Sequence, residues 1–244
     1  MLEVCRLTVA HGSLEAVRDV SFEVPTGTVV AVLGPNGAGK TSILEAVSGM
    51  RRPVGGRISF QGERIEALPP HAVWRRGIAH VPENRLIFMR LTVEENLAVA
   101  AASHMSRAQA GRQRDRVLEH MPELVARLGA PASALSGGQQ QLLAVGRGLM
   151  ADPRLLILDE PTLGLSPLAT EGVFDLVARL AADGLSILLV DQNVLRVLDA
   201  ADEVHVMDKG RIVLSGAGRV LANEPLFNEA LLGVTRRAPY EEKS

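Results

Sequence analysis

Eight consecutive residues near the N-terminus have the types and spacing that polyphosphate binding requires. Gly34-Pro35-Asn36-Gly37-Ala38-Gly39-Lys40-Thr41 fits the pattern G-x-x-x-x-G-K-[ST] at every fixed position, and Ser42 follows it. The glycines let successive backbone N–H groups point inward, and a helix beginning here would add partial positive charge. Lys40 can reach the β- and γ-phosphates, and the Thr41 hydroxyl can ligate Mg²⁺. A glycine-rich turn that binds nothing would need neither three glycines nor the Lys-Thr pair, so the motif predicts nucleotide binding.

Two acids follow an apolar run much later in the chain. Leu155–Leu158 reads as a buried strand, and Asp159-Glu160 come directly after it. A strand of a parallel sheet delivers such side chains to the carboxyl edge, where ligands bind. Asp159 is suited to hold Mg²⁺, and Glu160 to orient and deprotonate an attacking water. The plainer alternative is that both acids only end a strand before Pro161.

A serine-glycine turn lies between these two motifs. Ser136-Gly137-Gly138-Gln139 precedes a helical run at Leu142–Met150, so it offers a helix N-terminus with open backbone donors. Taken alone, the turn is equally well explained as an ordinary helix cap. Its position between a phosphate loop and an acidic strand gives it a second possible role as an anion site.

The elements around these motifs alternate between strand and helix, which predicts an α/β fold with a mostly parallel sheet flanked by helices. The turn at His11 separates the first two strand-like segments. Expected strands lie at residues 2–10, 16–24, 28–33, 57–65, 155–158, 185–190 and 204–207, and expected helices at 41–50, 168–182 and 194–200.

Residues 86–150 differ from this alternation and are expected to form a helical subdomain. Thr92 and Glu95 make a capping box before an apolar run, and the stretch is rich in Ala, Arg and Gln. We expect one domain over residues 2–233 and a polar tail over 234–244.

Composition restricts the class of protein. The 244 residues are 47% hydrophobic and 22% charged with a net charge of −2, so nothing indicates nucleic acid as the main partner. Acids are interspersed in the one arginine cluster, which suggests a solvated helix face; its members are Arg107, Arg112, Arg114 and Arg116. A single cysteine, Cys5, fits a reducing compartment. The start lacks a secretory signal, and no apolar stretch approaches the ~18 residues of a membrane span. If the protein acts at a membrane, we therefore expect it to do so through partner proteins.

The motifs together resemble one family. Leu135-Ser136-Gly137-Gly138-Gln139 resembles the signature sequence of ABC ATPases, and the order of phosphate loop, signature and acidic strand matches over about residues 2–233. The resemblance implies a P-loop NTPase fold with an N-terminal antiparallel β subdomain and a helical subdomain. It also implies ATP and Mg²⁺ as ligands, Asp159 as the metal-binding acid and Glu160 as the catalytic base. In such a family two subunits dimerise head to tail, and Ser136 to Gln139 of one contact the ATP held by the other.

Three positions depart from the usual family residues. His11 stands where an aromatic, often Tyr, stacks on the base, although a surface turn histidine remains the alternative. Glu83, in Val81-Pro82-Glu83, stands where a Gln contacts Mg²⁺ and the attacking water, so it is expected to serve both metal and catalysis. Gln192 replaces the usual histidine near the γ-phosphate; it can donate a hydrogen bond but carries no charge.

These departures resemble one subfamily, an ATP-binding subunit of branched-chain amino-acid importers. The residues that carry the resemblance are Val81-Pro82-Glu83 with Arg85, the run 91–97, Leu165-Ser166-Pro167 and Asp191-Gln192-Asn193. It implies a second ATPase subunit, identical or homologous, transmembrane permease subunits and, indirectly, a solute-binding protein, with the chain on the cytoplasmic face of the cell membrane. Competing hypotheses are an importer ATPase for another small polar solute, a soluble ABC ATPase uncoupled from transport, and a nucleotide sensor with little hydrolysis.

Overall fold

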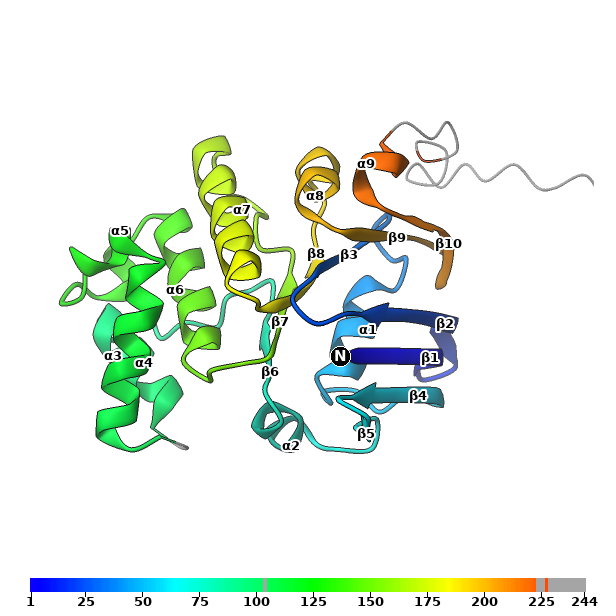
Figure 1. Cartoon of the computed structure of the whole chain (residues 1–244), viewed down its shortest axis with the longest axis horizontal. Coiled ribbons are helices and arrows are strands. Elements are labelled where there is room, and N and C mark those ends of the chain that lie inside the picture. The colour runs from blue at the N-terminus through cyan, green and yellow to red at the C-terminus, as the bar shows by residue number, and fades with distance from the viewer. Residues whose placement is uncertain (103–104, 223–226, 228–244) are drawn as a thin grey trace, which may run out of the picture.

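The chain folds around two β-sheets with helices packed against them (Figure 1). The computed structural model describes residues 1–102, 105–222 and Phe227, so the expected polar tail at 234–244 lies outside the described residues. Within that described part, no helix combines the length and hydropathy that a bilayer-spanning segment requires.

The larger sheet has six strands in the order β10-β9-β3-β8-β7-β6. Five of them run parallel, and only β10 is antiparallel to its neighbour β9. β3, β7 and β8 are buried along their whole length, as expected for continuous apolar runs covered on both faces. The strands are β3 (Val29–Leu33), β6 (Ile78–Val81), β7 (Leu155–Asp159), β8 (Ser186–Val190), β9 (Glu203–Asp208) and β10 (Arg211–Gly216).

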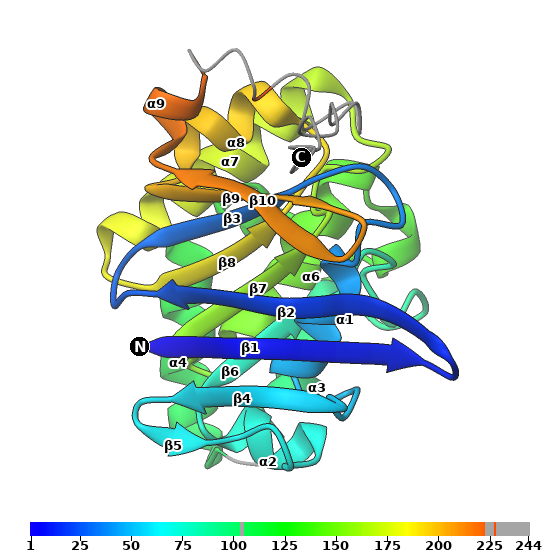
Figure 2. The same ribbon diagram turned by 90° about the vertical axis from the view of Figure 1, so that its right-hand side faces the viewer.

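The smaller sheet is antiparallel and forms the expected N-terminal β subdomain. Its order is β2-β1-β4-β5, and these strands lie side by side in Figure 2. They are β1 (Leu2–His11), β2 (Leu14–Val24), β4 (Gly55–Phe60) and β5 (Glu63–Arg64). Buried and exposed residues roughly alternate along β1, because one sheet face covers the core and the other meets solvent.

Helix α1 (Lys40–Val47) packs between the two sheets, in contact with β1, β2 and β7. The side chains of β3 divide between two cores. Val30 and Val32 join the core shared by α1 and the antiparallel sheet, whereas Ala31 and Leu33 join the core under the other helices. Because side chains alternate along a strand, β3, which leads into the phosphate loop, packs into one core on each of its two faces.

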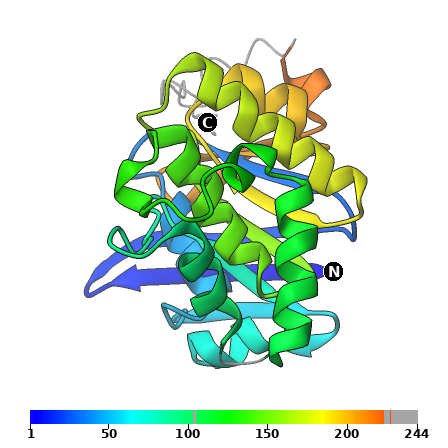
Figure 3. The ribbon, with the colours of Figure 1, turned by 90° about the vertical axis from the view of Figure 1, so that its left-hand side faces the viewer.

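The predicted helical region is present and is made of several separate helices, seen from outside in Figure 3. The predicted capping box between Thr92 and Glu95 is confirmed at the start of α3. α6 packs against α3, α7 and β6, which joins this region to the sheet. The helices that follow α1 are α2 (Pro70–Arg75), α3 (Val93–Ala101), α4 (Arg107–Glu119), α5 (Pro122–Val125), α6 (Gly137–Leu149), α7 (Pro167–Ala182), α8 (Val194–Ala200) and α9 (Gly218–Leu221).

One predicted helix boundary was wrong. α1 ends at Val47 and does not reach Met50, because Gly49 takes a φ of 75°, which breaks the helix. The predicted helix N-terminus at Ser136 is confirmed: Ser136 caps α6, which begins at Gly137, five residues before the apolar run Leu142–Met150. Four short elements had no sequence prediction: α2, β6, β10 and α9.

Candidate active site

The predicted site residues meet at the carboxyl edge of the parallel sheet. β3, β8, β7 and β6 are consecutive neighbours, and they lead into Gly34, Asp191, Glu160 and Pro82 respectively. A cavity of about 640 Å³ lies at this edge. Its lining residues are His11, Leu14, Ala16, Asn36, Gly37, Gly39, Lys40, Thr41, Ser42, Glu83, Glu160, Leu163 and Gln192. The phosphate loop, His11, Glu83, Glu160 and Gln192 therefore surround one space, and the serine-glycine turn does not contribute to it.

The phosphate loop needs its glycines for steric reasons. Gly34 has a φ of 149°, and a Cβ there would lie 2.3 Å from the carbonyl oxygen of Met207. Gly39 has a φ of 105°, and a Cβ there would lie 2.3 Å from the carbonyl oxygen of Ala16. Neighbouring backbone thus approaches the loop too closely for any side chain, which fixes the curl that turns the amides inward.

Lys40 is held inside this loop. Its side chain is only 5% exposed, and Nζ donates hydrogen bonds to the carbonyl oxygens of Gly34 at 2.8 Å and Pro35 at 3.1 Å. Burial lowers the pKa of Lys40, although the nearby carboxylates of Glu160 and Asp159 act in the opposite direction. The ammonium group is therefore a partly desolvated cation whose attraction for a phosphate is little screened by water.

Asp159 is the most strongly perturbed acid of the site. The residue is 3% exposed, and its Oδ1 atom is buried without a hydrogen-bond partner. Burial raises its pKa to about 6, and the charges of Glu160 and Glu83 add to the rise, whereas a hydrogen bond from Thr41 and the charge of Lys40 oppose it. A buried carboxylate oxygen without a partner is costly unless a cation binds it, so the position fits a metal ion.

Glu160 and Gln192 face each other across the strand ends. The Gln192 amide Nε2 donates to Glu160 Oε2 at 2.6 Å and to Asn36 Oδ1 at 3.4 Å. Glu160 has a φ of 46°, a left-handed conformation that is uncommon for residues other than glycine, and its N–H donates to the Val190 carbonyl oxygen. The turn at the end of β7 therefore lets Asp159 point into the sheet edge while Glu160 reaches the cavity.

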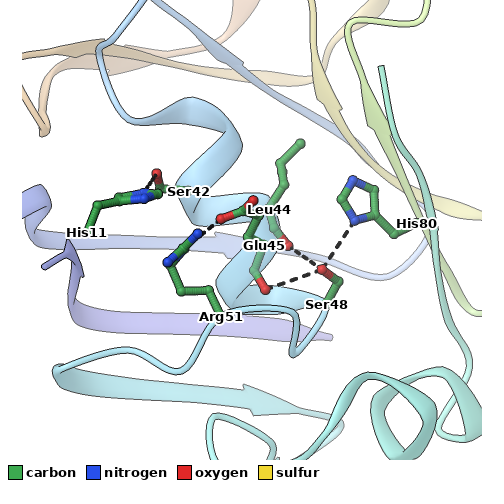
Figure 4. Close-up of polar contacts among 7 residues, drawn as sticks. All are labelled: His11, Ser42, Leu44, Glu45, Ser48, Arg51 and His80. Atoms are coloured by element: carbon green, nitrogen blue, oxygen red, sulfur yellow. Dashed lines mark hydrogen bonds and ion pairs between the residues drawn. The ribbon is translucent and has the colours of Figure 1, made fainter. Parts of the chain in front are cut away.

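His11 is fixed against the first turn of α1. Its Nε2 atom and the Ser42 hydroxyl oxygen lie 2.9 Å apart, and Figure 4 shows the ring directed at the Ser42 hydroxyl. The imidazole consequently lines the cavity beside the half-exposed side chain of Leu14. A ring and an aliphatic side chain form an apolar wall suitable for one face of a nucleobase.

Glu83 joins the other acids at the cavity. The residue lies in the loop after β6, lines the cavity and contributes to the raised pKa of Asp159. No group of three His, Cys, Asp or Glu residues forms a ready-made metal site within the described part of the chain.

The serine-glycine turn lies apart from the cavity in a single chain. Its members are not among the cavity's lining residues in the part of the chain that is described. Ser136 Oγ accepts from the Gln139 N–H, and the Gln139 side chain accepts from the Ser136 N–H, which closes a capping box on α6. The cap explanation is therefore confirmed as a structural role.

One contact of the site, between Asp191 and Thr162, was not predicted from the sequence. Asp191 is 2% exposed, and its carboxylate accepts from the Thr162 hydroxyl at 2.7 and 2.8 Å, from the Thr162 N–H at 3.2 Å and from the Asn193 N–H at 2.8 Å. It thereby joins the segment after Glu160 to the segment that carries Gln192. A run of Asp-Gln-Asn after a buried strand was visible in the sequence, but its partner 29 residues away was not.

Comparison with known proteins identifies the family of this site. The family model described as ABC transporter matches residues 17–163, which include the phosphate loop, the signature turn and both acids. The chain belongs to the ABC transporter family. As an ATPase subunit of that family, it binds ATP and hydrolyses it to drive transport.

Several curated ABC subunits resemble the chain over nearly its whole length. It is 40% identical to the high-affinity branched-chain amino acid transport ATP-binding protein BraG of Pseudomonas aeruginosa, covering 96% of this chain and 100% of the relative. It is 35% identical to the probable branched-chain amino acid transport ATP-binding protein LivF of Archaeoglobus fulgidus, covering 96% and 99%. The lipopolysaccharide export system ATP-binding protein LptB of Escherichia coli is 32% identical, covering 93% and 95%.

Solved structures confirm the fold. A nucleotide-free ATP-binding cassette from an ABC transporter superposes with a TM-score of 0.83 at 26% identity, covering 94% of this ABC ATPase and 98% of that chain. An ATP-binding cassette in its ADP conformation gives a TM-score of 0.84 at 26% identity, covering 96% and 98%. The predicted α/β class with antiparallel and helical subdomains is therefore correct.

Proposed function

We propose that this ABC ATPase energises an importer of branched-chain amino acids. The observation that carries the proposal is the 40% identity to BraG over the whole relative, against 32% to LptB. The residues Asp191-Gln192-Asn193, of which Gln192 lines the cavity, support it, because they resemble the acidic-Gln-Asn triplet of such subunits, with Asp191 and Asn84 departing slightly from the usual Glu-Gln-Asn and Pro-Glu-Gly-Arg. An importer of another small polar solute, or an exporter resembling the LptB system, is the alternative that experiments must separate from it.

ATP would lie in the 640 Å³ cavity with its phosphates on the loop from Gly34 to Thr41. The inward amides and the buried ammonium of Lys40 supply positive charge without bulky side chains. Lys40 would exchange its carbonyl contacts within the loop for the β- and γ-phosphates. His11, already oriented by Ser42, would stack on the base.

Thr41 and Asp159 would hold Mg²⁺ when ATP is bound. Thr41 would supply a hydroxyl ligand and Asp159 a carboxylate oxygen that otherwise has no partner, with Glu83 on the same side of the cavity. When bound, the ion neutralises charge on the β- and γ-phosphates. In the metal-free chain, burial disfavours the charged form of this carboxylate, and the pKa of Asp159 is therefore raised.

Hydrolysis requires a base that can accept a proton from the attacking water. Glu160 reaches the cavity and would accept a proton from the attacking water. The Gln192 amide holds the carboxylate oxygen Oε2, which leaves Oε1 to face the water. A neutral amide in place of a histidine orients the base and introduces no charge that changes near neutral pH.

A second ATPase subunit would complete each site. Ser136, Gly137, Gly138 and Gln139 lie outside this chain's own cavity, although the N-terminus of α6 carries open donors suitable for a γ-phosphate. Closure of two subunits around ATP would bring that turn to the partner's nucleotide. Permease subunits in the cell membrane, with the ATPase on its cytoplasmic face and a solute-binding protein on the other side, would use this closure.

The ATPase role is tested by replacing single groups of the cavity. Glu160→Gln should lower kcat by about 10²- to 10⁴-fold while ATP affinity, measured by calorimetry, changes less than about threefold. Lys40→Ala should weaken ATP binding by at least about tenfold. Hydrolysis by Glu160→Gln at the parent rate would remove Glu160 from the mechanism.

The cargo needs a separate test. The chain is reconstituted in liposomes with its permease subunits and solute-binding protein, and ATPase activity is measured with and without leucine, isoleucine or valine. Stimulation by these three and none by polar amino acids supports the proposal. Stimulation only by another solute, or by lipopolysaccharide, would reject the cargo and leave the ATPase role intact.

A further inference from the structure

The loop that carries Glu83 is bound to α6 through Arg85. The Arg85 guanidinium donates from Nε to Gln141 Oε1 at 3.0 Å and from Nη1 to Gln140 Oε1 at 3.3 Å. Both glutamines lie near the start of α6, and the Gln141 side chain is buried. One planar cation therefore spans two side chains of the same helical turn, a contact that a flexible single-donor group could not reproduce.

The amide of Gln140 is also fixed from the other side. Its Nε2 donates to the carbonyl oxygens of Ala132 and Leu135, so its Oε1 atom is the group that points to Arg85. The Gln140 N–H in turn donates to the Ser136 carbonyl oxygen at 2.8 Å. Arg85 is thus connected through Gln140 to the segment on both sides of the Ser136 cap.

A second contact holds the same loop farther along α6. Arg147 donates from Nη1 to the Leu86 carbonyl oxygen, and its guanidinium carbon lies 4.7 Å from the centre of the Phe88 ring. Arg85 and Leu86 both have positive φ, 60° and 49°, a conformation that side chains disfavour and that persists only where surrounding contacts hold it. The loop after Glu83 is therefore fastened to α6 at Arg85, Leu86 and Phe88.

We propose that Arg85 is a positioning residue that makes the Glu83 loop and the Ser136 tip of α6 move as one unit. Glu83 faces the nucleotide bound by this chain, whereas Ser136 is presented to the nucleotide of the partner subunit. Arg85 would thereby transmit the state of one site to the other. This last role rests on the proposed function, because it requires the trans contact of Ser136; the mechanical link itself does not.

Hydrogen exchange of the full-length chain, without permeases, tests the link. Arg85→Ala should speed exchange about tenfold in both segments 83–88 and 136–143, and leave the phosphate loop 34–41 unchanged. Arg85→Lys keeps the charge but offers one donor at a time. Its exchange rates in these segments should lie between those of the parent and those of Arg85→Ala. Arg90→Ala removes an exposed arginine five residues away and serves as the matched control, with no change.

Kinetics separate positioning from a general structural role. Arg85→Ala should keep ATP affinity within about twofold, because Arg85 does not line the nucleotide cavity, while kcat falls about tenfold and Arg85→Lys recovers part of it. Adding Gln140→Ala and Gln141→Ala to Arg85→Ala should cause no further loss.

Three results would overturn the proposal: unchanged exchange at 136–143, faster exchange that extends equally to 34–41, or an equal loss of affinity and kcat. A wrong cargo assignment would alter none of these measurements, because they need no permease and no transported solute.

Discussion

The side-chain amide of Gln192 donates a hydrogen bond of 2.6 Å to the carboxylate of Glu160, at the mouth of the nucleotide cavity. An amide has no pKa in the range where proteins work, so Gln192 donates this hydrogen bond without any change in its own charge between acid and alkaline pH. A histidine at the same position would change its charge near neutrality.

Substitution of Gln192 should therefore change both rate and pH dependence. Gln192→Ala removes the contact and should lower kcat about tenfold. Gln192→His should introduce a rate change with an apparent pKa near 6.5 that the parent lacks, since the new imidazole titrates there. The measurement is kcat at saturating ATP between pH 5.5 and 8.5. A parent profile that already contains this change would contradict the assigned role of Gln192.

Asp191 should be needed for the alignment of Glu160 with Gln192. Asp191→Asn places an NH₂ group among three donors, from the Thr162 hydroxyl, the Thr162 N–H and the Asn193 N–H. We expect the free energy of unfolding to fall by about 1–3 kcal/mol and kcat to fall with little change in ATP affinity. Urea denaturation and steady-state kinetics measure the two effects.

Two variants show whether the Asp191 contact acts as inferred. Thr162→Val removes one donor from the same contact and should lower kcat less than Asp191→Asn. Asp191→Glu restores a carboxylate and should recover part of the rate. Full activity in Asp191→Asn would show that the contact does not position the catalytic pair.

Asp159 should destabilise the metal-free chain at neutral pH. Its pKa rises from 3.8 to about 6 on folding, so the folded state binds the proton more tightly and loses stability as the pH rises through about 6. The loss at pH 8 is about 3 kcal/mol. In EDTA, Asp159→Asn should therefore be more stable than the parent by about 1–3 kcal/mol at pH 8, and by about a third of that at pH 4.5, where the unfolded state has lost most of its proton and the folded state has not. Thermal or urea unfolding at the two pH values measures this.

With Mg²⁺ and ATP bound, the parent should be more stable than Asp159→Asn, which is the reverse of their order in EDTA. The parent gains stability from the bound ligand, whereas Asp159→Asn lacks the carboxylate that holds the metal, so it should gain much less. An equal stabilisation of both proteins by Mg²⁺ and ATP would exclude Asp159 as a ligand.

The sequence predicted the residues of the site better than their connections. Continuous apolar runs such as Val29–Leu33 and Leu155–Leu158 identify buried parallel strands, and residues after such strands meet at one edge of the sheet. β6 escaped prediction because four residues carry too little periodicity, yet it places Glu83.

The parts of the site that were not predicted from the sequence depend on contacts between distant segments. Arg85 with Gln141, 56 residues apart, and Asp191 with Thr162, 29 apart, depend on how α6 and the strand ends pack. No local pattern of charge or hydrophobicity specifies such pairs, because each member is an ordinary polar residue of a loop or helix. The capping box at Ser136, by contrast, is local and could be predicted from four residues.

His80 lies in β6, just before the loop that carries Glu83, and it should make the stability of the folded chain depend on pH in acid. Its Nδ1 and the Ser48 hydroxyl oxygen lie 3.2 Å apart (Figure 4), and its Nε2 is buried without a partner. The Ser48 hydroxyl already donates to the Leu44 carbonyl oxygen at 2.8 Å, so His80 donates from Nδ1 and is neutral. Burial lowers the pKa of His80 to about 4, although the charge of Glu45 opposes the shift.

Because the unfolded chain has a histidine pKa of about 6.5, the unfolded state binds the proton first as the pH falls. The stability that neutral His80 contributes is present above pH 6.5 and is lost progressively down to about pH 4. Between pH 7.5 and 5 the parent should lose about 2 kcal/mol more of its free energy of unfolding than His80→Asn, which cannot titrate. Urea denaturation of both proteins at the two pH values measures the difference, and the comparison cancels every other titrating group. Parallel losses in parent and variant would mean that His80 accepts a proton in the folded state as readily as in the unfolded one.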